Sequence, residues 1–170
     1  EEELIQYIRS GNNAIERLST ADEIHSSVLI AVGAVDRSEL LRIIQENHGR
    51  LFVAMDNCPN QAIICGDKEI TTKVLEQLQA IGAVCQALPF ARPYHTPMFE
   101  SASGVMREFF SNLKIVSPKI KIYSCMTARP MPSDTDEIRK LVVGQWAHQV
   151  RFRETIESMY HDGVRIFLEV

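Results

Sequence analysis

The sequence predicts an α/β protein, with a β-α-β-β-α-β lobe over residues 27–90, a helical segment over residues 1–26 and a mixed part over residues 91–170. Short continuous apolar runs typical of buried strands alternate with segments in which apolar residues keep helical spacing. Aspartate, asparagine, glycine and proline stand between these segments, where helix caps and turns need them. The order of elements in residues 27–90 is that of a ferredoxin-like lobe.

The lobe is predicted to contain strands at residues 28–32, 51–55, 61–65 and 84–88, with helices at residues 36–46 and 67–81. Asp36 and Asp67 stand where an aspartate can cap each helix. Gly33 and Gly66 are expected to end the first and third strands. Residues 56–60, Asp-Asn-Cys-Pro-Asn, have the composition of a turn.

Outside the lobe the pattern is more irregular. Three prolines make residues 89–97 stiff and non-helical. The predicted elements are helices at residues 1–20, 98–113, 134–148 and 151–160, and strands at residues 120–125 and 164–170. The apolar stripe of residues 98–113 predicts a helix packed against a core.

Composition excludes several classes of protein. The 170 residues are 45% hydrophobic and carry 18 Lys and Arg against 22 Asp and Glu, a net charge of −4. This is a globular composition rather than a disordered one. The mildly acidic charge predicts no nucleic-acid partner, and no run nears the roughly 20 apolar residues that span a bilayer. The acidic start differs from a signal peptide, so we expect a cytoplasmic protein without a membrane partner.

Four cysteines are widely spaced, without a Cys-x-x-Cys pair or a histidine at zinc-ligand spacing. The sequence therefore predicts neither a metal site nor a disulfide framework. Cys65 and Cys85 lie in apolar runs, where a free thiol behaves as a small buried hydrophobic group.

His95 is the histidine best placed for chemistry. His48 and His161 lie in polar helix-end or turn contexts typical of the surface. His95 instead lies between Pro93 and Pro97, after a predicted strand and before a helix. A stiff loop holds the imidazole in place, as general acid–base catalysis requires. The residues alone leave open whether His95 is catalytic or a structural loop histidine.

Four segments resemble acyltransferases of the malonyl-CoA:acyl carrier protein transacylase family. Residues 88–98, Leu-Pro-Phe-Ala-Arg-Pro-Tyr-His-Thr-Pro-Met, are similar to the segment around the family's catalytic histidine. Residues 56–66 resemble its Asn-Gly-Pro turn and the next strand, with Cys58 in place of glycine. Residues 145–152 resemble its Pro-Val-Arg-Phe segment, and residues 167–170 resemble a later strand. Within the family, the Arg-Pro-Tyr-His-Thr-Pro segment and the Asp-Asn-Cys-Pro turn look most like those of iterative type I polyketide synthases, including the enediyne type.

The resemblance implies an α/β-hydrolase-like large lobe into which the ferredoxin-like lobe is inserted. Residues 1–26 and 91–170 then belong to the large lobe. The family's nucleophile is a serine in a Gly-His-Ser-x-Gly elbow, and no Gly-x-Ser-x-Gly occurs in this chain. We therefore expect the chain to be the C-terminal portion of the domain, to need the missing N-terminal portion as its partner, and to be inactive alone.

The activity implied by the resemblance is transfer of a malonyl-type acyl group from CoA to the phosphopantetheine of an acyl carrier protein. His95 would accept the serine's proton, and the backbone carbonyl of Gln145 would orient the ring. An ordinary polar position on a helix is the alternative for Gln145. No cofactor is expected to be tightly bound, because the CoA thioester is a substrate and phosphopantetheine belongs to the partner.

Arg92, Asn57 and Tyr94 are the expected substrate-binding residues. The arginine with which the family pairs an acyl carboxylate is not clearly present in residues 10–15. Arg92 lies three residues before His95, and its planar guanidinium suits a carboxylate. A solvent-facing loop arginine is the alternative.

Three other functions stay open. The absent arginine favours an acyltransferase for a non-carboxylated starter group. A domain kept only for carrier-protein docking would lack a nucleophile serine upstream. An independent ferredoxin-like small-molecule module is disfavoured, because residues 98–170 carry a large apolar surface and too few strands to close a sheet.

Overall fold

The computed structural model of the chain describes residues 2, 5–7, 9–11, 13, 27–89 and 92–169. The helix predicted for residues 1–20 is confirmed where residues 2–13 are described, and its remainder lies outside the described residues. The other elements are β1 (Ser27–Gly33), α2 (Arg37–Glu46), β2 (Leu51–Cys58), β3 (Gln61–Asp67), α3 (Lys68–Ala80), β4 (Val84–Ala87), the 3₁₀ helix η1 (Pro97–Ala102), α4 (Ser103–Ser111), β5 (Tyr123–Ser124), β6 (Arg129–Pro130), α5 (Thr135–Gly144) and α6 (Phe152–His161).

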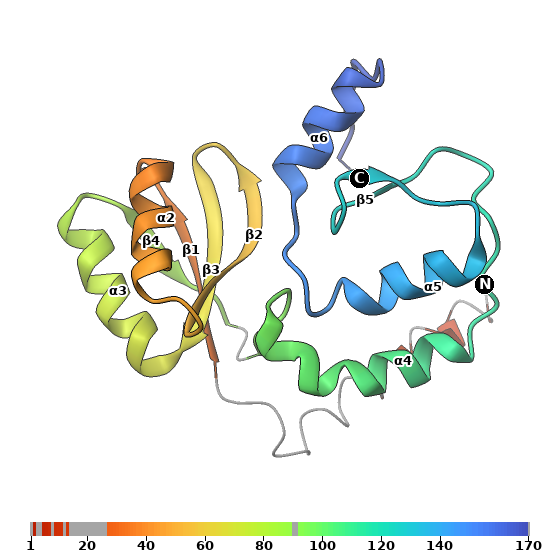
Figure 1. Ribbon diagram of the computed structural model, residues 1–170, viewed down its shortest axis with the longest axis horizontal. Coiled ribbons are helices and arrows are strands. Elements are labelled where there is room, and N and C mark those ends of the chain that lie inside the picture. Colours follow the sequence, from red (N-terminus) through yellow and green to blue (C-terminus); the bar gives the residue numbers. More distant parts are fainter. Residues whose placement is uncertain are drawn as a thin grey trace.

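The predicted β-α-β-β-α-β lobe is confirmed. Its antiparallel sheet has the strand order β2-β3-β1-β4, with Ile30 of β1 opposite Ile64 of β3 and Ala87 of β4. Helices α2 and α3 cover one face of this sheet (Figure 1). Asp36 and Asp67 accept backbone N–H groups at the two helix starts, as the capping pattern predicts.

The sheet of this lobe is buried on both faces. Ile30 and Ile64 point into the core formed with α2 and α3, whereas Leu29 and Cys65 belong to a second cluster on the other face. Each of these four side chains is at most 1% exposed. Burial on both faces is why the strand sequences read as continuous apolar runs.

Two sequence expectations within the lobe are wrong. Residues 56–58 continue β2, and only residues 59–60 form the turn, because the hairpin ladder extends to the pair Cys58–Gln61. Gly66 lies inside β3 rather than ending it. A Cβ at Gly66 would stand 2.5 Å from the carbonyl oxygen of Arg50, so the glycine permits close approach of the backbone.

The second part of the chain is mostly helical. Helices α4 and α5 run side by side, and α6 packs against β2 (Figure 1). A separate core surrounds Phe99 and Met106, which are 0% and 2% exposed. It confirms that the apolar stripe of residues 98–113 faces a core, although the first turns are 3₁₀ rather than α-helical.

Several predicted elements here are shorter than expected or absent. The strand of residues 120–125 is reduced to β5, and the helix of residues 134–148 ends at Gly144. Residues 164–169 form no strand, because no described segment pairs with them. No helix in the described part of the chain is long and apolar enough to cross a membrane.

Candidate active site

The loop that carries His95 is held by its own backbone and by two prolines. Pro93 is buried, and Pro97 starts η1. Thr96 is fully buried, and its hydroxyl donates to the carbonyl of Pro93 at 2.7 Å. His95 has a φ of +63°, and its backbone N–H donates to the carbonyl of Trp146 at 2.8 Å. The loop thus presents the imidazole from a left-handed position that few non-glycine residues adopt.

The imidazole of His95 is fixed by the backbone of Gln145. Its Nδ1 lies 2.8 Å from the carbonyl oxygen of Gln145. A carbonyl oxygen can only accept, so this contact assigns the proton to Nδ1 and leaves the lone pair on Nε2. Nε2 has no hydrogen-bond partner within residues 27–89 and 92–169. A histidine in this state can accept a proton at Nε2.

The carbonyl of Gln145 is available because a helix ends there. Helix α5 stops at Gly144, and Gln145 is its C-cap. The last carbonyls of an α-helix have no partner within the helix. Gln145 is therefore not an interior helix residue, and its amide side chain, which donates to Val142, is not what contacts His95.

An aromatic cluster supports the ring from one side. The rings of His95 and Trp146 are stacked, with centroids 6.4 Å apart and planes 13° from parallel. Trp146 also contacts Tyr94 and Phe99, at centroid distances of 5.8 and 6.1 Å. This packing joins the His95 loop to the turn after α5, so the two segments that hold the imidazole share one core.

Of the expected substrate-binding residues, Arg92 and Tyr94 lie on the same loop as His95. Both are half-buried, and Arg92 Nη1 donates to the hydroxyl of Tyr94 at 3.3 Å. Asn57 lies on β2 instead, and its amide donates to Gln61 across the hairpin. The structure thus brings His95 and Gln145 into contact and leaves Asn57 on the hairpin of the lobe. The substrate-binding roles of Arg92, Tyr94 and Asn57 stay predictions.

Sequence reasoning missed a buried carboxylate beside Asn57. Asp56 is 1% exposed and accepts hydrogen bonds from the guanidinium groups of Arg37 and Arg153. The sequence sign of this buried carboxylate is a charged residue, Asp56, directly after the apolar residues of a predicted strand. Its turn-like neighbours hid this signal.

Cys65 is excluded as a nucleophile by its surroundings. Burial raises the pKa of its thiol to about 11, so the thiol stays protonated near neutral pH. All four cysteines are free, and the described residues contain no group of three or more His, Cys, Asp or Glu able to hold a metal ion.

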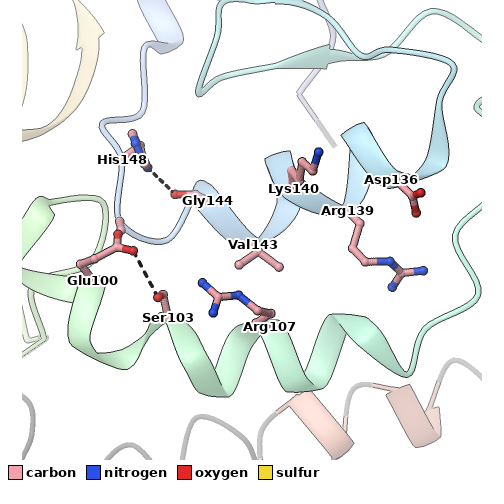
Figure 2. Close-up of a pocket in the computed structure, with 10 residues that line it drawn as sticks. Glu100, Ser103, Arg107, Asp136, Arg139, Lys140, Val143, Gly144 and His148 are labelled. Atoms are coloured by element: carbon pink, nitrogen blue, oxygen red, sulfur yellow. Dashed lines mark hydrogen bonds between the residues drawn. The ribbon is translucent and has the colours of Figure 1, made fainter.

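A groove of about 480 Å³ lies between α4 and α5 (Figure 2). Arg107 points into it from α4, and Lys140 and Val143 border it from α5. Gly144 and His148, whose ring Nδ1 lies 2.7 Å from the Gly144 carbonyl oxygen, form its end. The groove borders the turn that holds His95, but His95 itself does not line it.

The structure joins a β-α-β-β-α-β lobe to a loop whose histidine is oriented by a backbone carbonyl, and comparisons with known proteins show what this arrangement resembles. No model of a known protein family matches the sequence. Two sequence relatives are 6-methylsalicylic acid synthase of Penicillium patulum, 27% identical over 144 residues, and malonyl CoA-acyl carrier protein transacylase of Haemophilus influenzae, 28% identical over 149 residues. The matches cover 84% and 85% of this chain, but 8% and 47% of the relatives.

Solved structures agree with these relatives. The malonyl CoA-acyl carrier protein transacylase of Coxiella burnetii superposes with a TM-score of 0.81 at 20% identity, over 96% of this chain and 51% of that one. The acyltransferase domain from the second module of the salinomycin polyketide synthase has a TM-score of 0.74 at 19% identity, over 93% and 35%. The fold class predicted from the sequence is confirmed.

The relatives and structural neighbours of this chain are thus malonyl-CoA:acyl carrier protein transacylases and polyketide synthase acyltransferase domains, as the resemblance indicated. The chain spans about half the length of the bacterial transacylases that it matches. The narrower resemblance to iterative type I synthases stays a prediction.

Proposed function

We propose that this chain carries the general base of an acyltransferase domain of a polyketide synthase, which moves a malonyl-type acyl group from CoA to the phosphopantetheine of an acyl carrier protein. The observation that carries the proposal is the contact between His95 Nδ1 and the carbonyl oxygen of Gln145. A backbone carbonyl thereby orients the ring, a task that an aspartate performs in a Ser-His-Asp triad, and Nε2 is left as the base. The names of the relatives supply the substrate class.

The proposed reaction has two matching halves. His95 Nε2 accepts the proton of a serine hydroxyl from the other part of the domain as the serine oxygen attacks the thioester carbon. The carbon–sulfur bond then breaks, and the imidazolium returns the proton to the CoA thiolate, which leaves the acyl group on serine. In the second half Nε2 takes the proton of the pantetheine thiol, the sulfur attacks the acyl carbon, and the ester bond between that carbon and the serine oxygen breaks. The proton finally returns to the serine oxygen.

The test uses the protein at its native length, incubated with malonyl-CoA and followed by intact mass. The wild type is expected to gain one malonyl group and to pass it to an added carrier protein. His95→Ala should slow acylation by roughly 10²–10⁴-fold, the usual contribution of a general base.

His161→Ala is the matched control. The ring Nδ1 of His161 also lies near a backbone carbonyl oxygen, that of Glu157 at 2.7 Å, but at the exposed end of α6. It should acylate at the wild-type rate. Equal rates for His95→Ala and the wild type would refute the proposal. If the protein accepts an acetyl group in preference to malonyl, the proposed substrate changes to a non-carboxylated acyl group.

A further inference from the structure

The junction between the lobe and α6 contains a carboxylate shared by two arginines. Arg37, the first residue of α2, donates from Nη1 and Nη2 to the two oxygens of Asp56, at 2.8 and 2.6 Å. Arg153, on α6, donates from Nε and Nη2 to Asp56 Oδ2 at 3.3 and 3.2 Å. Asp56 is 1% exposed, so all of its carboxylate is used inside the protein. One side chain on β2 therefore ties together α2, β2 and α6.

The backbone makes a second connection at the same place. The N–H of Asp56 donates to the carbonyl of Val150 at 2.8 Å, and the N–H of Val150 donates to the carbonyl of Ala54 at 2.9 Å. Val150 thus pairs in parallel with Met55, on the outer edge of β2. The connection from α5 to α6 is therefore bound to the lobe by backbone as well as by charge.

The register of β2 explains why an aspartate can point inward there. The pairing of β2 with β3 shifts between Val53 and Met55 and again between Asp56 and Cys58. Such bulges bend a strand and re-aim its side chains, and they recur next to active sites. Asp56 lies between the two shifts, which turn its carboxylate toward both arginines.

The same short connection holds His95 at its other end. Residues 145–150 run from the Gln145 and Trp146 carbonyls, which bind the ring and backbone of His95, to Val150. We propose that Asp56 is a positioning residue: by pairing with Arg37 and Arg153 it fixes residues 145–150, and so keeps the Gln145 carbonyl on His95 Nδ1. The predicted effect on kcat rests on the proposed function, whereas the predicted effect on the His95 ring does not.

A buried ion cluster is poor evidence for stability by itself, because desolvation offsets most of the attraction. What the cluster gives is geometry, since a planar guanidinium that binds through two nitrogens restrains distance and orientation together. A displacement of about 1 Å at a catalytic group can cost roughly 10²-fold in rate. The effect of Asp56 should therefore be larger on kcat than on KM.

The test compares Asp56→Asn and Arg153→Met with Arg42→Met in the native-length protein labelled with ¹⁵N-histidine. Arg42 pairs with Glu39 and Glu46 on the exposed surface of α2, so it controls for loss of an ion pair. Long-range proton–nitrogen spectra report which ring nitrogen of His95 is protonated, with His95→Gln for assignment. Acyl transfer from malonyl-CoA gives kcat and KM.

Both Asp56→Asn and Arg153→Met are expected to lower the share of the Nδ1–H form and to reduce kcat by roughly ten- to a hundredfold at similar KM. Arg42→Met should change neither. Arg153→Lys, which keeps the charge, should recover part of the loss. If Asp56→Asn does not fold, Arg153→Met alone tests the positioning role. The Arg153→Met protein keeps the ion pair between Arg37 and Asp56, so it is expected to fold.

The proposal is wrong if folded Arg153→Met keeps the wild-type tautomer and kcat, even when its free energy of unfolding falls. If the wild type transfers no acyl group, the proposed function fails. The tautomer measurement still tests the positioning role in that case.

Discussion

The two parts of the chain differ in how they bury their apolar residues. The lobe has apolar clusters on both faces of its sheet, and its four strands pair with one another. The part from residue 92 to 169 has one core around Phe99 and leaves other apolar side chains open, such as Ile120, Ile166 and Leu168, which are 75–84% exposed. The sheet and the candidate catalytic histidine are therefore on different parts, joined by contacts of Asp56 and Val150.

The largest expected effect comes from removing one buried side chain from each of the two cores and comparing the two variants. Phe99→Ala and Leu78→Ala both remove a fully buried side chain, one beside the site and one in the lobe. Each should lower the free energy of unfolding by about 2–5 kcal/mol, measured by urea denaturation. Only Phe99→Ala should also lower acyl-transfer kcat, because Phe99 packs on Tyr94 and Trp146.

An equal fall in kcat for both variants, measured where each is still folded, would contradict this separation. The site would then depend on the lobe's core as much as on its own.

Arg92→Ala tests the substrate side of the site. If Arg92 binds the malonyl carboxylate, kcat/KM for malonyl-CoA should fall by about tenfold or more, the size of a charge-assisted hydrogen bond. Transfer of an acetyl group should change little, and Arg92→Lys should lie between. A similar loss with malonyl and acetyl groups would remove the carboxylate role and leave Arg92 as a support for Tyr94.

The smallest effect concerns the lobe alone. Asp67 accepts the N–H of Ile70 at the start of α3, and this hydrogen bond, together with Arg50, lowers the pKa of the Asp67 carboxyl. The folded pKa lies below the unfolded one, so the stabilisation is complete above about pH 4 and is lost as pH falls through the folded pKa. Asp67→Ala should cost about 1 kcal/mol at pH 7.

The cost of Asp67→Ala should shrink toward pH 2, when urea denaturation is repeated across that range. A penalty that does not change with pH would mean that the carboxylate charge has no part in it. Acyl transfer at pH 7 should be unaffected, because the side chain of Asp67 contacts Ile70 and Arg50 and not the segment that holds His95.

The sequence predicts the lobe well because its signals are local. Continuous apolar runs and the caps Asp36 and Asp67 each depend on neighbours within a few residues. The turn expected at residues 56–60 is wrong in most of its length, since pairing with β3 and the buried ion cluster outweigh a turn-like composition. No local signal shows that Arg37 and Arg153 meet at Asp56, because these residues lie 19 and 97 positions from it.

The site was predictable in part, for a related reason. Two prolines make the His95 loop visible in the sequence. The contact between Gln145 and His95 spans 50 positions and was indicated only by resemblance to a family. Gly144 is a local sign that α5 can end there, but the predicted helix continued to residue 148. Packing of Trp146 and Ala147 into the Phe99 core replaces that further helical turn.

The most direct test of the account is a crystal structure of the native-length protein. We expect a serine hydroxyl from the other part of the domain within about 3 Å of His95 Nε2, with Nδ1 still on the Gln145 carbonyl. A structure in which Nε2 faces only solvent, or in which the Gln145 carbonyl has left the ring, would contradict it.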